Sequence, residues 1–301
     1  MKRNCGSTYL VFIFSIIASL MLLSCAGEKK VQSYVSFYTG SVTLQRGNSA
    51  PVQVQIKEAV QDGDIFRTGE KSCLILQSSD GLVIRFESDT EAVISSLQVI
   101  AKREIDLNKG KVLSSVEKLK KGDSYSVKTS TVVASVRGTE FLTEYGDKGV
   151  IIAVGKGVVS VKNTSGAGEE KLIDKGKSAV EAPGTETIEI RDVNKVEILE
   201  LTKLEKTPVV QELDKKTPDE LKEIFRETEK SDEEINEAIR VEAGLSYEEM
   251  KAKYGRVDII TLYSGRVIQG IILSRGVTYK ILTNKGPIAV NAKDVKRTDS
   301  K

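Results

Sequence analysis

The sequence contains no histidine. Ser-His-Asp and Cys-His catalysis, histidine-rich zinc sites and imidazole proton transfer are therefore excluded by composition. Carboxylate or lysine chemistry, including an enzyme with paired carboxylates, is left open, but no motif along the chain points to it. We expect a protein that is not an enzyme, with no catalytic residue, no bound metal and no cofactor.

Cysteine is also scarce, with three residues in the chain: Cys5, Cys25 and Cys73. The first two fall at the extreme N-terminus, so Cys73 has no partner for an intrachain disulfide. It lies in a strand-like apolar run, Ser72-Cys73-Leu74-Ile75-Leu76, where a small buried side chain fits well. Because no histidine is present to activate the thiol, we expect it to be buried and unreactive.

An excess of charge of one sign is missing as well, since 45 Lys and Arg face 43 Asp and Glu. Proteins that bind nucleic acid concentrate a basic excess on one face. We therefore expect no nucleic-acid partner.

The N-terminus has the pattern of an export signal. Basic Lys2 and Arg3 precede an apolar run from Leu10 to Leu23, which is 14 residues long and too short to cross a ~30 Å hydrocarbon core. Residues 1–24 are thus predicted to be a cleavable signal peptide. An ordinary secretory signal followed by a chance cysteine is the alternative.

The end of this run, Leu22-Leu23-Ser24-Cys25, resembles the bacterial lipobox. The resemblance implies that Cys25 is the first residue of the mature chain and is acylated by diacylglycerol. It predicts a lipoprotein anchored outside the cytoplasm in the cell envelope. We favour the outer membrane, since Ala26 replaces the aspartate that retains many lipoproteins at the inner membrane; acidic Glu28 leaves the inner membrane as the alternative. Residues 25–33 would form a tether.

From residue 34 to residue 184 the chain reads as an all-β domain. Short alternating segments such as Val52, Val54 and Ile56 point every second side chain to one face. Gly-Asp turns separate them, as at Asp62-Gly63-Asp64. A calcium site is the alternative interpretation of Asp62 and Asp64, but it needs further oxygen ligands at regular spacing.

Several motifs follow one another in this region: Gly40-Ser41-Val42, Asp62-Gly63-Asp64-Ile65, Asp80-Gly81 with Ile84-Arg85, Val136-Arg137-Gly138-Thr139-Glu140-Phe141 and Gly155-Lys156-Gly157-Val158. Their order resembles that of the FecR domain, over roughly residues 34–181. The resemblance implies an all-β fold, either a sandwich or a short β-roll, and a role in contacts outside the cytoplasm.

The Arg137-Gly138-Thr139 element is the candidate site within this resemblance. We interpret it as structural: Gly138 would adopt a conformation closed to other residues, while Arg137 and Thr139 would bond neighbouring turns. The alternative is that Arg137 binds an anionic ligand.

From residue 185 to residue 255 the composition shifts to Glu, Lys and Asp, which predicts a helical connector. Thr217, Ser231 and Ser246 each precede a glutamate by three residues, the spacing of a capping box. An earlier helix is expected from about Val193 to Leu204. The connector is interpreted as a spacer, with a partner-binding helical hairpin as the alternative.

Strand patterns return from residue 256 to residue 298, separated by Ser264-Gly265, Arg275-Gly276 and Lys285-Gly286. Four or five strands in so short a stretch resemble a small SH3-like or Sm-like β-barrel. A domain of this size buries little surface by itself, so we expect it to lean on the preceding helices.

The sequence thus predicts a mainly β, lipid-anchored envelope protein that acts as a binding or scaffold module. Its expected partners are the membrane, through the anchor, and an envelope protein or glycan. FecR proteins of the sensor type hold a sigma factor through a cytoplasmic segment, and no such segment precedes residue 25. The alternative function is an extracytoplasmic subunit of a FecR-type signalling system.

Overall fold

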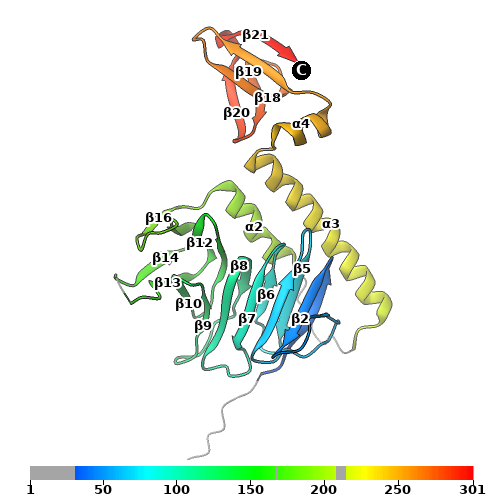
Figure 1. Cartoon of the computed structure of the whole chain (residues 1–301), viewed down its shortest axis with the longest axis vertical. Coiled ribbons are helices and arrows are strands. Elements are labelled where there is room, and N and C mark those ends of the chain that lie inside the picture. Colours follow the sequence, from blue (N-terminus) through cyan, green and yellow to red (C-terminus); the bar gives the residue numbers. More distant parts are fainter. Residues whose placement is uncertain (1–30, 167, 208–214, 301) are drawn as a thin grey trace, which may run out of the picture.

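The computed structural model of the protein describes residues 31–166, 168–207 and 215–300. A large β domain is followed by three helices and by a five-stranded C-terminal sheet at the far end of the molecule (Figure 1). The fold is therefore mainly β, as predicted. The strands of the β domain are β1 (Ser33–Thr39), β2 (Val42–Arg46), β3 (Val52–Gln53), β4 (Asp64–Thr68), β5 (Cys73–Ser78), β6 (Val83–Phe86), β7 (Glu91–Ser96), β8 (Arg103–Ser115), β9 (Tyr125–Lys128), β10 (Val132–Val136), β11 (Glu140–Gly146), β12 (Gly149–Lys156), β13 (Val158–Asn163), β14 (Lys171–Asp174), β15 (Lys177–Glu181) and β16 (Ile188–Asp192).

The long strand β8 is shared by two layers of the β domain. Its first half pairs with β7 and β9, and its second half pairs with β6 and β11. Between the halves lies Gly110, with φ +96°, where an added Cβ would lie 2.5 Å from the Cα of Thr90. Glycine is required at this close approach. The first layer runs β3-β2-β4-β7-β8-β9-β10-β13-β14 and the second runs β1-β5-β6-β8-β11-β12-β15-β16.

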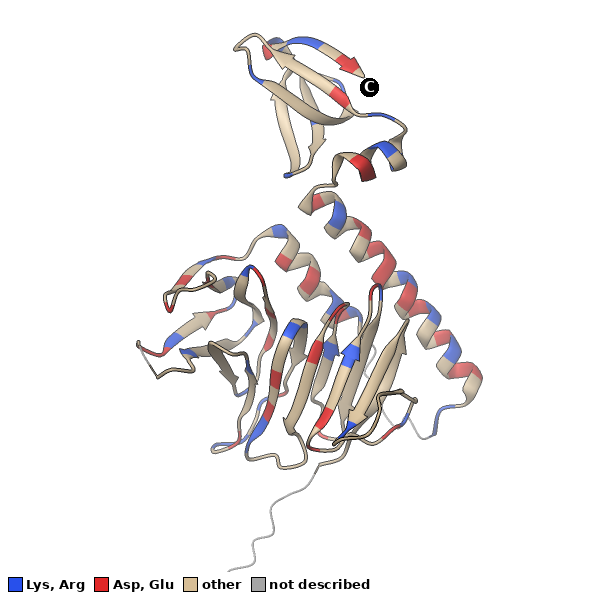
Figure 2. Cartoon of the chain, viewed as in Figure 1, with Lys and Arg blue, Asp and Glu red and all other residues tan. Residues whose placement is uncertain are grey.

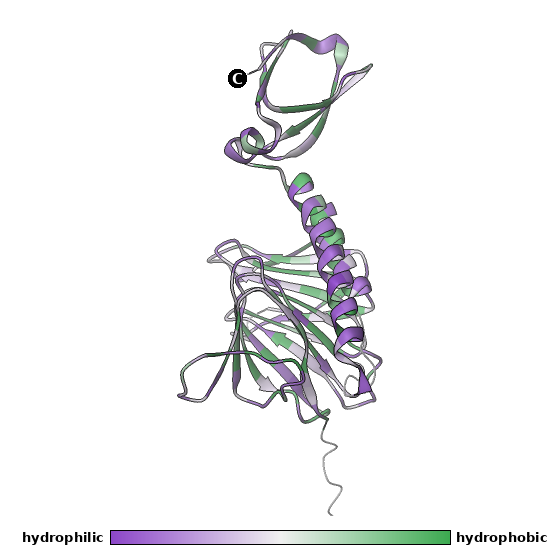
Figure 3. Cartoon of the chain, turned by 90° about the vertical axis from the view of Figure 1, so that its right-hand side faces the viewer, coloured by the Kyte–Doolittle hydropathy of each residue, from purple (hydrophilic) through white to green (hydrophobic). Residues whose placement is uncertain are grey.

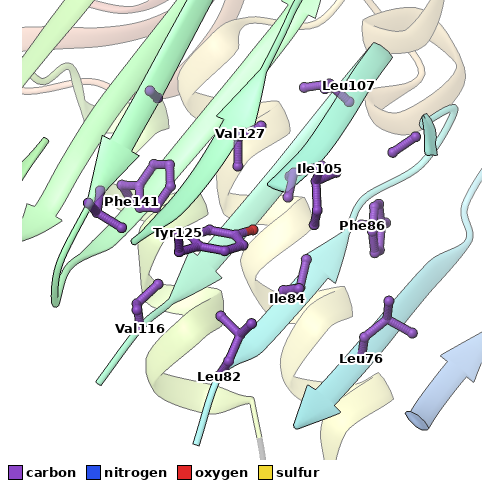
Figure 4. Packing of buried hydrophobic residues seen from close by; sticks show 14 of the residues in the cluster. Leu76, Leu82, Ile84, Phe86, Ile105, Leu107, Val116, Tyr125, Val127 and Phe141 are labelled. Carbon is purple, nitrogen blue, oxygen red and sulfur yellow. The ribbon is translucent and has the colours of Figure 1, made fainter. Parts of the chain in front are cut away.

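The main core is formed by side chains of both layers. Leu76 and Ile84 of the second layer belong to the same buried cluster as Ile105 and Val127 of the first, and these side chains converge in Figure 4. Apolar residues alternate along most strands, as a strand with one buried face requires. Strand β5 differs, because all six of its residues are buried. Such a strand must be covered on both faces.

Helices α2 (Lys195–Lys206) and α3 (Pro218–Ala243) supply this second cover, across the outer face of the second layer (Figure 1). Leu204 of α2 packs on Leu113 and Leu142. Phe225 of α3 contacts Phe37 edge to face, with ring centroids 5.0 Å apart. Figure 3 shows that the rest of α3 is largely hydrophilic. Both helices are thus packed against the β domain.

Two of the predicted capping boxes are confirmed, at Thr217 for α3 and at Ser246 for α4 (Tyr247–Tyr254). The helix start predicted at Ser231 is wrong. Helix α3 runs through this position and is 26 residues long in all. No proline or glycine interrupts it, and its inner face packs on the sheet. Helix α2 begins with a third capping box, Asn194 with Glu197, which the sequence analysis missed.

The C-terminal sheet contains β17 (Asp258–Leu262), β18 (Val267–Ser274), β19 (Thr278–Thr283), β20 (Gly286–Asn291) and β21 (Val295–Ser300). Its order is β20-β19-β18-β17-β21, with no ladder between the end strands, so the closed barrel expected from the sequence is not formed. A three-residue 3₁₀ helix, η2 (Ala292–Asp294), carries the chain between these end strands. Leu245 and Met250 share a cluster with Ile271 and Leu282, which attaches α4 to the sheet.

The predicted boundaries of the tether and of the helical connector agree with the structure only in part. The predicted signal peptide and Cys25 lie outside the described residues. Ser33, at the end of the predicted tether, already belongs to β1. Strand β16 lies within the segment predicted as the helical connector and pairs with β15. Across the described ranges, no helix is long and apolar enough to span a bilayer.

Candidate functional site

The Arg137-Gly138-Thr139 element forms the link between β10 and β11. Its backbone is fixed by a preceding loop: the amide of Leu119 donates to the carbonyl of Arg137 at 2.7 Å. Thr139 and Val116 exchange backbone hydrogen bonds of 3.0 and 3.1 Å. The Thr139 hydroxyl, which is buried, donates to the carbonyl of Val158 at 3.1 Å. The element therefore joins three segments of the β domain.

Two glycines make this arrangement possible. At Gly138 φ is +154°, and an added Cβ would lie 2.9 Å from the Cα of Lys118. At Gly157, where φ is +79°, an added Cβ would lie 2.6 Å from the carbonyl oxygen of Gly138. Contacts this short with backbone atoms cannot be relieved by a side-chain rotation. The backbone of the turn therefore requires glycine at both positions.

The Arg137 side chain lies outside this backbone framework. It is exposed and lines a cavity of about 610 Å³ together with Lys118, Lys156, Glu117 and Glu140. Lys156 pairs with Glu140 at 3.4 Å, whereas no described residue forms a hydrogen bond or ion pair with the Arg137 guanidinium. A planar guanidinium presents five donors and suits a carboxylate or phosphate. Thr139 bonds a neighbouring segment through its hydroxyl, and Arg137 does so through its backbone carbonyl but not through its guanidinium.

A second charged site is buried between the second layer and the helices. Arg85 of β6 contacts Asp232 of α3 at 2.6 Å and Glu87 at 2.5 Å. Lys203 of α2 contacts Glu87 at 2.6 Å. The network extends through Glu200 of α2, which contacts Lys203 at 2.7 Å and Lys111 of β8 at 2.5 Å. The Arg85 side chain is 1% exposed and that of Lys203 is 2% exposed.

Ion pairs and burial have opposing effects on the charge states in this cluster. Burial by itself raises the pKa of Glu87, but Arg85 and Lys203 outweigh it and lower that pKa to about 2. Burial also lowers the pKa of Arg85, and the neighbouring carboxylates raise it above its usual value. For Asp232 burial is the larger effect, and its pKa is raised. The cluster thus joins both helices to the sheet through charges that burial would otherwise disfavour.

Cys73 lies beside this cluster and lines a groove of about 700 Å³ with Arg85 and Asp232. It is a buried free thiol, as expected, and burial raises its pKa to about 12. A thiol with so high a pKa carries almost no thiolate at neutral pH. The structure thus provides no reason to treat Cys73 as a nucleophile.

Most of this cluster was missed by the sequence analysis. Arg85 was singled out only as part of a motif, and Asp232 directly follows Ser231, which was interpreted as a helix cap. The available signal was the position of Arg85 within the apolar run Val83-Ile84-Arg85-Phe86, where a charged residue must find a buried partner. The partner itself could not be found by inspection, because Asp232 is 147 residues away.

The two aspartates considered for calcium have structural contacts in the fold. Asp62 accepts a hydrogen bond from the amide of Leu97 at 2.8 Å. Asp64 accepts from Arg46 at 3.0 Å and from the amide of Gln61 at 2.9 Å. Among the residues that the structure describes, no group of three or more acidic, cysteine or histidine side chains could hold a metal.

Comparison with known proteins places a family match on the β domain. Residues 64–160 match the family model described as FecR protein, from β4 into β13. The matched range contains both the Arg137 turn and Arg85, and it is shorter than the region in which the motifs were identified. No curated protein matches the chain.

Two crystal structures of a protein from Parabacteroides distasonis, assigned as an anti-sigma factor, are similar to this chain. They were determined at 1.65 and 2.50 Å resolution, and each shows 13% identity and a TM-score of 0.40. The alignments cover 47% and 46% of this chain, and 64% of the other chain in both cases. The shared part is thus less than two thirds of that protein.

Proposed function

We propose that this protein is an extracytoplasmic, non-enzymatic component of a FecR-type signalling system. The observation that carries the proposal is the match of residues 64–160 to the FecR protein family, because these residues form the centre of the β domain. The buried carboxylates Glu87 and Glu200 support a role without catalysis, since both are engaged in ion pairs with lysine or arginine.

The exposed Arg137 is the residue that we expect to contact the partner. The backbone around it is tied to the loop at residues 116–119, so the guanidinium projects from a rigid turn rather than from a flexible loop. Lys118 adds a second positive charge at the edge of the same cavity. This arrangement favours an acidic group on an envelope protein or glycan.

The membrane attachment that we propose is acylation of Cys25, with the outer membrane as the favoured location. Several acyl chains hold a protein at a bilayer far more firmly than one chain does. Mass spectrometry of the membrane fraction should find an N-terminal peptide that begins at Cys25 and carries lipid. An N-terminal peptide that retains residues before Cys25 would contradict this attachment.

Deletion of the gene that encodes this protein distinguishes a signalling role from a purely structural role in the envelope. We expect that deletion changes the abundance of a restricted set of transcripts, and that the wild-type protein restores it. The Arg137→Ala variant should be present at normal levels and fail to restore them. A matched control is Arg226→Ala, because Arg226 is an exposed arginine on α3.

The structural alternative is a binding or scaffold module that maintains the envelope. It predicts altered resistance to detergent with no restricted transcript response to the deletion. That outcome would contradict the signalling proposal.

A further inference from the structure

The C-terminal sheet differs in charge from the rest of the protein. Residues 256–300 contain eight Lys and Arg and three Asp and Glu, whereas residues 31–255 contain 32 and 39. Figure 2 shows many acidic positions along α3, next to this basic sheet. A basic sheet at one end of an otherwise acidic protein is attracted to negatively charged surfaces. We therefore expect such a contact at the C-terminal end of the molecule.

Large apolar side chains are exposed in the turns of the same sheet. Tyr263, between β17 and β18, is 71% exposed, and Val277, between β18 and β19, is 81% exposed. The core of the sheet is complete without them, because Ile260, Ile268 and Ile281 are buried. Turns normally carry small or polar residues. Exposed apolar side chains at two turns therefore indicate a contact surface.

The 3₁₀ helix η2 brings these two turns to one end of the sheet. The amide of Ala292 donates to the carbonyl of Val277 at 2.9 Å. Two residues further on, Asp294 accepts from the amide of Tyr263, also at 2.9 Å. The two apolar turns thus flank a single three-residue segment.

We call this surface the apolar rim and define it by Tyr263–Arg266, Arg275–Val277 and Ala292–Asp294. Arg266, Arg275 and Lys293 are its exposed basic residues, and Asp294 is its one acidic residue. Each apolar tip thus has an exposed arginine two or three residues away in the same turn, and Lys293 lies in the segment between the turns.

We propose that the apolar rim docks on the surface of an anionic lipid bilayer. Exposed apolar residues with exposed basic residues in the same turns match an interface in which acyl chains lie beneath phosphate groups. Tyrosine is suited to this depth, since its ring is apolar and its hydroxyl is polar. The rim lies far from the start of the described chain, which is at the opposite end of the β domain from the C-terminal sheet (Figure 1), so we expect the contact to form without acylation at Cys25.

The chain contains no tryptophan, which permits a direct test. The protein used is residues 31–301, the segment that contains every described element. In it, Tyr263→Trp introduces a single fluorescent reporter at the apolar rim. We expect its emission to shift to the blue with vesicles of phosphatidylcholine and phosphatidylglycerol in equal amounts. The matched control is Val52→Trp, at a site on the β domain that is 57% exposed. Its emission should not change.

Binding measurements on the same vesicles test the composition of the rim. Tyr263→Ser combined with Val277→Ser should weaken vesicle binding by about tenfold or more, given the apolar area that is lost. Val52→Ser combined with Leu172→Ser removes two exposed apolar side chains from the β domain and should leave binding unchanged. Circular dichroism verifies that each variant is folded.

Three results would overturn the proposal. One is the absence of a blue shift at position 263, and another is an equal shift at position 52. The third is equal binding to pure phosphatidylcholine, because the basic residues would then play no part. If inorganic phosphate abolished vesicle binding, and the Tyr263→Trp variant showed no blue shift with vesicles, the basic residues would instead bind a soluble anion.

Discussion

Two arginines within the FecR-like range occupy opposite environments. Arg85 is buried between the sheet and α3 and is paired with Glu87 and Asp232. Arg137 is exposed at a turn, and no described residue pairs with it. The backbone around Arg137 is nevertheless constrained, because Gly138 fits closely against Lys118. The contrast separates an arginine that joins elements of the fold from one that a rigid fold presents to a partner.

The buried site adds charged contacts to the apolar ones that hold the two helices on the β domain. Each helix contributes charged partners to the cluster: Lys203 and Glu200 from α2, and Asp232 from α3. Removing one member leaves another buried charge with one partner fewer, which costs more than a surface pair contributes. Stability should therefore depend strongly on the cluster and weakly on Arg137.

The largest effect is expected for Asp232→Ala, which leaves the buried Arg85 with Glu87 as its remaining carboxylate. We expect the free energy of unfolding to fall by about 3 kcal/mol, measured by urea denaturation. Glu223→Ala is the control on the same helix, because Glu223 pairs with Arg226 at the surface. That variant should change stability by less than about 1 kcal/mol. Equal losses in the two variants would show that burial of the pair has no consequence.

The pH dependence of stability is the second test of the buried site. The pKa of Glu87 is lowered from 4.5 to about 2 in the folded protein, so its stabilising effect is complete above pH 4.5 and is lost as the pH falls towards 2. This shift corresponds to up to about 3 kcal/mol. Asp232 has the opposite sign, because its pKa is raised and its protonation in acid favours the folded state.

Comparison with Glu87→Gln isolates the contribution of Glu87 from that of other carboxylates. Wild-type stability, followed by urea denaturation from pH 6 to about pH 2, should decrease more steeply than that of the variant. Parallel curves would mean that Glu87 does not titrate with a lowered pKa.

A smaller loss is expected at the turn itself, for Gly138→Val. The new side chain would meet the backbone of Lys118, and we expect the β domain to lose more than about 1 kcal/mol of stability. Gly146→Val is the control, because an added Cβ at Gly146 meets no atom within 4 Å. Thermal melting of both variants provides the measurement. If Gly138→Val melted at the same temperature as the wild type, the turn would accept a side chain.

Features encoded over a few residues could be predicted from the sequence. Alternating strands, the helix starts at Thr217 and Ser246, and the buried position of Cys73 depend on local spacing and composition. The local pattern was misleading at Ser231, because α3 contacts the sheet on both sides of this position, through Phe225 and Asp232, and runs through it as one helix.

Features that depend on distant pairing could not be predicted. The spacing of the C-terminal strands does not reveal that β20 and β21 do not pair with each other and leave the sheet open. The element around Arg137 was found through its resemblance to a family, while its fit against Lys118 became visible only in the fold. Arg85 and Asp232 show the same limit, since neither local sequence identifies the other.

The smallest effect on stability is expected for Arg137→Ala. Its guanidinium has no bond within the described structure, and the turn is held by the carbonyl of Arg137 and by Thr139, which the substitution retains. Stability in urea should therefore change by less than about 0.5 kcal/mol, although the transcript response should be lost. A loss above 1 kcal/mol would show that the arginine side chain supports the fold. The distinction between Arg85 and Arg137 would then be one of degree, and a partner-binding role for Arg137 would lose its structural basis.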